Sequence, residues 1–308
     1  MAGEGIAGGN GGKMRFAQFF AVALLLASAE ARAADAPFSA DIKDIRAAGI
    51  SMPGARPIAI NVVKFAESRR TKNFAIKGAP REPSVQARTA YQIVYPDHTV
   101  MIDSGMDLQV HKFFGRGVEE PFFPEQEKEV ARAVRAARTI VMTHEHSDHI
   151  AGVIRSPESA TLAAKTVLTR TQVQTLTTEP QMPEIKLTPE QASRFTVIDY
   201  DKYRPFAPGM ALIKSSGHTP GSQMVYVVLQ SGKEYLFVGD ITWHMDGVRQ
   251  MLGKDAPWIS EPADQMMAEL TWLNGLMKNE RNLAIVVSHD EEQRLDYIRQ
   301  GFLGDKFK

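Results

Sequence analysis

The sequence of 308 residues contains no cysteine. Disulfides, thiolate metal ligands, iron–sulfur clusters and a cysteine nucleophile are therefore excluded at once. Any metal site in this chain must be built from histidine and carboxylate side chains. The chain also lacks an excess of either charge, because 36 Lys and Arg residues balance 36 Asp and Glu residues. Without a basic surplus, we expect no nucleic-acid partner.

No apolar run reaches the roughly 20 residues that a membrane-spanning helix needs. The best candidate, residues 16–29, follows Lys13 and Arg15 and precedes the small residues around Ala31 and Ala33. A basic start, a short apolar stretch and an A-x-A site are typical of a secretory signal peptide. We therefore expect residues 1–33 to be a cleaved leader, with an uncleaved anchor as the alternative. The mature protein is then secreted, into the periplasm, without stable membrane insertion.

The remaining residues, 34–308, have the composition of a globular protein, since 44% of the sequence is hydrophobic and 23% is charged. Short runs of β-branched and aromatic residues predict strands, and apolar stripes at helical spacing predict helices. Strands are expected at 58–65, 90–95, 99–102, 139–142, 195–198, 210–214, 224–229, 235–238 and 283–287, and helices at 125–138, 189–194 and 261–278. This order favours sheets with helices packed outside them. Pro205 and Pro208 suggest a junction between two halves near 202–209.

The most informative segment follows the strand expected at 139–142. It reads H-x-H-x-D-H and contains His144, His146, Asp148 and His149. Alternate spacing places the first two histidines on one side of an extended segment. Imidazole nitrogens and carboxylate oxygens are the ligands that zinc takes when no thiolate is present. The pattern predicts that one loop serves two neighbouring metal positions, the alternative being a set of solvated surface histidines.

Three further candidate ligands stand at the ends of expected strands. His218 lies in a Gly/Pro turn, Asp240 follows the strand at 235–238, and His289 follows the strand at 283–287. Taken singly, the two histidines could be ordinary turn residues and the aspartate a helix N-cap. Five of the eight histidines of the chain now fall into one pattern with two aspartates. That convergence predicts joint metal ligation.

These motifs, in this order, resemble the metallo-β-lactamase superfamily over residues 58–305, together with the segment 101–106 around Asp103. The resemblance implies an α/β fold of four layers, the αβ/βα sandwich, as one domain over 34–308 with two pseudo-symmetric halves and a metal site at one sheet edge. It implies two zinc ions per chain, although such ligand sets also accept other divalent metals. The implied ligands are His144, His146 and His218 for the first zinc and Asp148, His149 and His289 for the second, with Asp240 bridging the two.

Two local segments narrow the resemblance. Residues 217–223 and 288–293 are similar to motifs of the N-acyl-homoserine lactone lactonases. An aspartate at position 240 argues against the many β-lactamases that carry Cys or Ser there, and H-x-H at 144–146 argues against the di-iron flavoproteins. One position departs from the lactonases, which carry a tyrosine where this chain has Trp243. Because an indole N–H only donates, we expect Trp243 to polarise a substrate carbonyl without exchanging a proton.

The resemblance implies a hydrolase of a small-molecule substrate, most directly a lactone, in which a metal-bridging hydroxide attacks the carbonyl. Asp148 is expected to carry a proton to the leaving group as well as to bind metal. Asp103 and Asp290 are expected to orient ligand histidines through their ring N–H groups, a turn cap being the alternative for Asp103. The other functions considered are an organophosphate or aryl-ester hydrolase, a broad-substrate β-lactamase, a glyoxalase-type thioester hydrolase, and a protein that only binds a metal or ligand.

The substrate pocket is expected from two aromatic segments, an irregular stretch before the first clear helix and a long loop after Asp240. Large side chains there could cover the metals, or they could simply be core residues. The candidates are Phe113, Phe114, Phe122, Phe123, His244, Met245 and Trp258. The sequence is compatible with a monomer or a homodimer.

Overall fold

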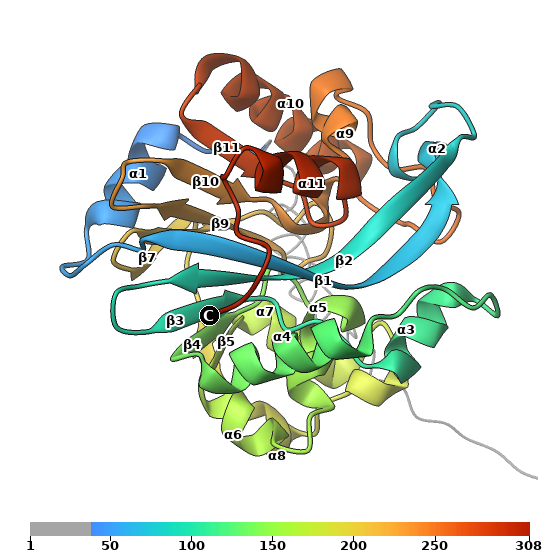
Figure 1. Ribbon diagram of the computed structural model, residues 1–308, viewed down its shortest axis with the longest axis horizontal. Coiled ribbons are helices and arrows are strands. Elements are labelled where there is room, and N and C mark those ends of the chain that lie inside the picture. The colour runs from blue at the N-terminus through green and yellow to red at the C-terminus, as the bar shows by residue number, and fades with distance from the viewer. Residues whose placement is uncertain (1–37) are drawn as a thin grey trace, which may run out of the picture. The chain divides into compact units, whose positions relative to one another are not determined.

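Two β-sheets face each other at the centre of the computed structural model, which describes residues 38–308 (Figure 1). The leader expected at 1–33 lies outside the described residues. The first sheet has the order β1-β2-β3-β4-β5-β6 and the second has the order β11-β10-β9-β8-β7. The first sheet comprises β1 (Ala59–Thr71), β2 (Pro83–Val94), β3 (Thr99–Ile102), β4 (Thr139–Val141), β5 (Thr166–Thr169) and β6 (Thr196–Ile198). The second comprises β7 (Tyr203–Ala207), β8 (Met210–Lys214), β9 (Gln223–Val228), β10 (Glu234–Phe237) and β11 (Leu283–Val286).

Helices cover the outer face of each sheet. Below the first sheet in Figure 1 lie α3 (Leu108–Gly115), α4 (Pro124–Ala136), α5 (Ser147–Ile154), α6 (Ser159–Ala164), α7 (Arg170–Thr178) and α8 (Pro189–Ala192). Against the second sheet pack α1 (Ile42–Ile50), α9 (Met245–Gln250) and α10 (Ala263–Asn279). Two short helices, α2 (Lys72–Ala75) and α11 (Glu291–Arg299), follow β1 and β11. The expected αβ/βα sandwich is confirmed.

Successive apolar side chains of a strand pack alternately between the two sheets and against the outer helices. In β8, Leu212 packs between the two sheets, while its neighbour Ile213 packs against the outer helices. In β1, Val62 faces the layer between the sheets and Val63 faces the helices below. Successive strand residues point to opposite faces, so both faces must be apolar in a sheet that is covered on both sides.

The junction between the halves differs from the expectation. The chain leaves the first sheet after Ile198 and enters the second sheet at Tyr203, so the segment 203–207 is itself β7. Pro205 is tolerated there because β7 is an edge strand, where a missing N–H costs no hydrogen bond to a second neighbour. β5 was not expected from the sequence, and the stretch expected to be irregular contains α3, which Asp107 caps.

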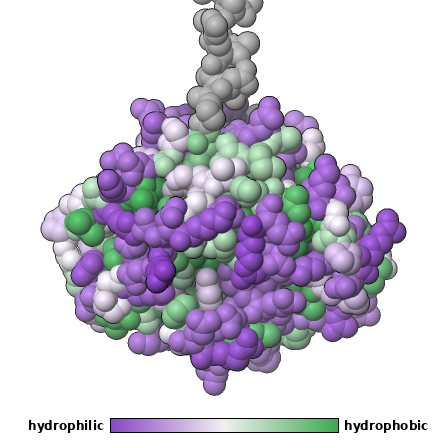
Figure 2. All heavy atoms as spheres, turned by 90° about the horizontal axis from the view of Figure 1, so that it is seen from above, coloured by the Kyte–Doolittle hydropathy of each residue, from purple (hydrophilic) through white to green (hydrophobic). Residues whose placement is uncertain are grey.

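Among residues 38–308, no helix combines the length and the apolarity needed to cross a bilayer. The face drawn in Figure 2 shows hydrophilic residues interspersed with smaller hydrophobic patches. Scattered apolar residues of this kind are usual on the surface of a folded protein.

Candidate metal centre

Each of the seven candidate ligands follows the end of a strand. The loop after β4 carries His144 and His146, and the first turn of α5 carries Asp148 and His149. His218 follows β8, Asp240 lies in the short 3₁₀ turn after β10, and His289 follows β11. Since β8 and β10 both run antiparallel to β9, and β11 runs parallel to β10, these strand ends meet at one edge.

The side chains form two clusters, and Asp240 of the second cluster lies between them. One cluster is His144, His146 and His218, the other is Asp148, His149, Asp240 and His289, and within each the potential ligand atoms all lie within 4.8 Å of one another. Asp240 Oδ2 lies 3.1 Å from His289 Nε2 in its own cluster. The same oxygen lies 3.9 Å from His144 Nε2 and 3.8 Å from His218 Nε2 in the other. The carboxylate of Asp240 is thus placed between the two clusters.

The buried atoms of the site fit a metal. Among the described residues, His144 Nε2, His149 Nε2 and Asp240 Oδ1 are buried without a hydrogen-bond partner. Burying lone pairs without a partner is costly, and all three atoms are metal-ligand types. A divalent cation at each cluster would satisfy them, so the residues present suit bound metal.

Protonation differs between the two clusters. Burial lowers the pKa of His144 and His218 well below the usual value and lowers the pKa of His146 to about 4. Burial also acts to lower the pKa of His149, but the carboxylates of Asp148 and Asp103 outweigh it and hold that pKa well above the usual value. The first cluster is therefore neutral and ready to bind a cation near pH 7, whereas His149 must first release a proton.

The two carboxylates of the second cluster are ionised. Burial acts to raise the pKa of Asp148, yet His149 and Arg88 outweigh it and hold that pKa well below its usual range. The same holds for the pKa of Asp240, where His289 and His149 outweigh burial. Both side chains therefore reach a bound cation as anions.

Asp103 makes the contact expected of it. Its Oδ2 lies 2.8 Å from His149 Nδ1, and its Oδ1 accepts the backbone N–H of Thr143 at 2.7 Å. The residue has a left-handed backbone, with φ 62°, an unusual conformation outside glycine that appears at constrained sites. One aspartate thus fixes both the loop that carries His144 and the ring that would present Nε2 of His149 to a metal.

Asp290 has a different role from the one expected. Its Oδ1 accepts the N–H of Gln293 at 2.9 Å as the N-cap of α11, and its Oδ2 accepts the N–H of Met245 at 2.7 Å. The ring of His289 is oriented instead by the carbonyl of Ala87, 2.7 Å from its Nδ1. Asp290 therefore fixes the loop after β11 rather than a ligand ring.

His218 is held by two residues that the sequence analysis did not identify. Glu261 Oε1 lies 2.5 Å from His218 Nδ1, which leaves Nε2 for the centre. Lys254 Nζ lies 2.6 Å from the same carboxylate and also donates to the backbone carbonyl of Asp240. Both residues belong to the irregular segment between α9 and α10, where no spacing pattern marks them.

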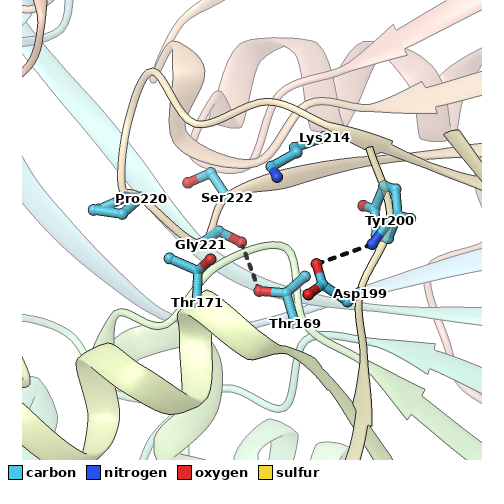
Figure 3. A pocket seen from close by; sticks show the side chains of 8 residues that line it. All are labelled: Thr169, Thr171, Asp199, Tyr200, Lys214, Pro220, Gly221 and Ser222. Carbon is cyan, nitrogen blue, oxygen red and sulfur yellow. Dashed lines mark hydrogen bonds between the residues drawn. The ribbon is translucent and has the colours of Figure 1, made fainter. Parts of the chain in front are cut away.

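The turn that carries His218 is also fastened to the first half of the chain. Glu145, the residue between the two histidines of H-x-H, accepts the Thr219 hydroxyl at 2.8 Å and the Gly221 N–H at 3.2 Å. Gln172 donates to the Gly221 carbonyl at 3.0 Å. The Thr169 hydroxyl also donates to the Gly221 carbonyl, at 3.5 Å (Figure 3). The small pocket lined by these residues contains none of the seven candidate ligands. The first half of the chain thus holds the turn that carries His218 in place.

A cavity of about 370 Å³ opens onto the centre and is lined by His146, Asp148, His218 and Asp240. Its walls include four of the expected aromatic residues, Phe113, Phe114, Trp243 and Trp258. The indole N–H of Trp243 donates to Asp240 Oδ2 at 2.8 Å. It is therefore already used to orient a candidate ligand, contrary to the expectation that it polarises a substrate carbonyl.

The other expected pocket residues lie outside this cavity lining. Phe122 packs on the core beneath the first sheet, and Phe123 lies under the ammonium group of Lys64. Met245 belongs to the core against α10, and the ring of His244 caps α9 by accepting the N–H of Asp246. These side chains are near the site in sequence, but the helices α4 and α9 begin here and turn them away.

The model of the metallo-beta-lactamase superfamily matches residues 84–266, more than half of the chain, and the chain therefore belongs to this superfamily of metal-dependent enzymes. No curated protein sequence matches it significantly. Solved structures share its fold at low identity. An N-acyl homoserine lactone hydrolase with the product N-hexanoyl-L-homoserine at its catalytic metal centre has a TM-score of 0.62 at 14% identity, covering 78% of this chain and 96% of that one.

Two further structures show the same fold. An AiiA mutant from B. thuringiensis, with N-decanoyl-L-homoserine at its active site, has a TM-score of 0.62 at 17% identity and covers 78% of this chain and 96% of its own. A probable metal-dependent hydrolase from Staphylococcus aureus has a TM-score of 0.58 at 15% identity and covers 78% and 91%. The chain is thus a metallo-hydrolase by fold and has a His/Asp cluster suited to divalent metals.

Proposed function

We propose that this protein is a dinuclear zinc hydrolase that opens lactones of the N-acyl-homoserine type. The observation that carries the proposal is the pair of neighbouring clusters, each with its ligand atoms within 4.8 Å of one another, with the carboxylate of Asp240 between them on the wall of a cavity. The product bound in a similar structure supports the choice of substrate. We further propose that residues 1–33 direct export to the periplasm and are then removed.

In this proposal His144, His146 and His218 hold one metal ion, and Asp148, His149 and His289 hold the other, with Asp240 shared. Metal ions bound there would polarise a carbonyl and lower the pKa of water. Trp243 fixes the shared carboxylate, Asp103 fixes His149, and Glu261 fixes His218. These contacts preorganise the ligands so that substrate binding need not rearrange them.

The chain also determines where substrate lies. Phe113, Phe114 and Trp258 line the cavity and offer apolar surface to an acyl group. Asp148 lines the cavity beside them and remains anionic, as its lowered pKa indicates. That protonation state favours its role as a ligand, and the proton that it was expected to carry to the leaving group is a secondary part of the proposal.

The test is acid release in a pH-stat, with purified protein loaded with zinc. The panel contains an N-acyl-homoserine lactone, a simple γ-lactone, a cephalosporin, an aryl phosphotriester and a glutathione thioester. Lactone opening that needs two zinc ions per chain, counted by mass spectrometry of metals, is the expected result. Silence on both lactones with turnover of another compound would retain the hydrolase and reject the lactone assignment.

A second candidate function is hydrolysis of aryl esters or aryl phosphotriesters. It is favoured by the number of aromatic side chains in the cavity wall, where Phe113, Phe114, Trp243 and Trp258 offer faces and edges to an aryl leaving group. The same panel separates the two functions, because a preference for the phosphotriester over both lactones would select the second.

A further inference from the structure

Two buried donors on β2 lack an acceptor. Gln86 Nε2 and Arg88 Nε are both buried without a hydrogen-bond partner among the described residues. Both side chains line the cavity that opens onto the candidate metal ligands. They are two residues apart on one strand and therefore lie on the same face of the sheet.

These donors differ in kind from the unpartnered atoms of the metal centre. His144 Nε2 and Asp240 Oδ1 offer lone pairs, as does His149 Nε2 once it has released its proton, and all three are metal-ligand atoms. An arginine N–H offers a proton and is satisfied only by an acceptor, so a bound metal leaves Arg88 Nε unpaired. A buried charged donor without a partner is costly, so a ligand that supplies an acceptor at this position gains binding free energy.

The position of Arg88 is fixed on its other sides. One terminal nitrogen donates to Asp148, the other donates to Ser68 Oγ at 3.1 Å, and the guanidinium plane lies over the ring of Phe114 at 4.6 Å. The residue is only 7% exposed. A guanidinium held in this way presents its Nε–H in a fixed direction, which suits recognition of a planar carboxylate.

Charge in the cavity also favours an anion. The lining carries three arginines (Arg70, Arg88, Arg116) and three carboxylates (Asp148, Asp240, Glu261), so their formal charges cancel. Any divalent cation bound to Asp148 and Asp240 makes the sum positive. Arg116, stacked on Trp258 at 4.1 Å, has no carboxylate partner among residues 38–308 and adds positive potential near the opening. The loaded cavity therefore attracts an anionic ligand.

We infer that Gln86 and Arg88 form a carboxylate-binding subsite and that the preferred lactone or ester bears a carboxylate near its scissile carbonyl, where an N-acyl-homoserine lactone carries an uncharged amide. The substrate part of this inference rests on the proposed hydrolase function. The subsite itself does not, because it can be measured by binding alone.

One experiment compares two matched pairs of compounds on the zinc-loaded protein. The reactive pair is a γ-lactone with a ring carboxylate and the same lactone with a carboxamide, followed in the pH-stat. The binding pair is glutarate and glutaramate, followed by calorimetry, since each has one carboxylate for a metal and they differ only at the second group. We expect the anionic member of each pair to be favoured about ten-fold, the scale of a charge-assisted hydrogen bond.

Gln86→Glu and Arg88→Gln should abolish both preferences, because one repels the second carboxylate and the other removes its charged donor. Zinc content is measured beside each variant, since Arg88 contacts Asp148 whereas Gln86 has no side-chain hydrogen bond to any of the seven candidate ligands. Arg135→Gln, an exposed arginine on α4 outside the cavity lining, is the matched control and should change neither preference.

Each remaining outcome decides between the claims. Equal affinity for glutarate and glutaramate in the unaltered protein would overturn the subsite, even if both lactones are opened. A preference that survives in Gln86→Glu and Arg88→Gln would also overturn it, by placing the recognition elsewhere. Failure to open any lactone, with tighter binding of glutarate that both variants lose, would reject the lactonase and leave the subsite standing.

Discussion

The two sides of the cavity are built differently. On the metal side, each candidate ligand follows a strand end, and contacts such as those from Asp103, Glu261 and Ala87 fix the rings. On the other side, here called the substrate side and meaning the aromatic part of the lining, Phe113 and Trp258 come from α3 and an irregular segment, and they are 47% and 37% exposed. Changes on the metal side should therefore abolish chemistry, whereas changes on the substrate side should alter selection.

The largest effect is expected from Asp240→Ala. Removing the carboxylate that lies between the clusters takes away a ligand atom of the second cluster and leaves the buried histidines of both clusters without this counter-charge. We expect at least about a thousand-fold loss of kcat/KM on whichever substrate the protein turns over, together with loss of bound zinc. Kinetics and metal analysis check this. A variant that keeps two zinc ions and full turnover would contradict the claim that the metal side carries the chemistry.

Lowering the pH should release metal from the second cluster before it releases metal from the first. The raised pKa of His149 means that protons compete with metal at the second cluster as soon as the pH falls below that pKa. The lowered pKa values of His144 and His218, and the pKa of about 4 for His146, keep the first cluster neutral to lower pH. Equilibrium dialysis over a pH series should show one metal ion leaving before the other, with activity falling at the first loss. Release of both metal ions at the same pH would contradict this difference in pKa between the two clusters.

Glu261→Gln tests whether the carboxylate of Glu261 strengthens His218 as a metal ligand. The amide can still contact His218 Nδ1 but cannot provide the negative charge that strengthens the ring as a ligand and pairs with Lys254. We expect metal affinity to fall about 10- to 100-fold, measured by competition with a chelator. Glu190→Gln on α8, an exposed carboxylate far from the centre in sequence and paired only with Arg194, serves as the control. Equal affinities for the two variants would show that the contact has no influence on the metal.

Trp258→Ala addresses the substrate side. The indole lies in the cavity wall and stacks with Arg116, but it has no contact with a candidate ligand among those described. We expect KM to rise by about three- to ten-fold through lost apolar and aromatic contact, while zinc content and the pH profile stay unchanged. Loss of zinc in this variant would mean that the two sides of the cavity are not separable.

The smallest effect is expected behind the His218 turn. Burial raises the pKa of Glu269 to about 7, from an ordinary 4.5, while its Oε1 accepts the N–H of Gly217 at 3.1 Å. The folded protein thus binds this proton more tightly than the unfolded chain, and stability is lost as the pH rises through 7. Glu269→Gln should remove up to about 3 kcal/mol of that loss, seen as denaturant unfolding that varies less between pH 5 and pH 8 than in the unaltered protein. Identical pH dependence in both proteins would contradict the prediction.

Much of the fold and of the metal side could be read from the sequence. Strands 99–102 and 210–214 were predicted to the residue, because β-branched and apolar residues bounded by turns leave a clear local signal. The seven candidate ligands were found because histidine is rare and H-x-H-x-D-H is a compact pattern. β5 and β7 were missed, since short strands with threonine or proline have no alternation that separates them from loops.

The substrate side was only partly readable. Phe113, Phe114 and Trp258 line the cavity as expected, whereas Phe122, Phe123, His244 and Met245 do not, because helix starts decide which way those side chains turn. Arg88, Lys254 and Glu261 carried no signal at all. A buried charge in the middle of a strand, or in an irregular segment, acquires its meaning only from partners that are distant in sequence.

The sequence by itself determined which groups are available for chemistry: histidines and aspartates at strand ends, no thiols, and a balanced charge. The tertiary structure alone decided how they are used. It brought the ends of β4, β8, β10 and β11 to one edge, gave the Trp243 N–H to Asp240, and left Arg88 facing a cavity with a donor unpaired. The physical reason is that ligand type is a property of single residues, whereas burial, pairing and direction arise only when distant segments pack together.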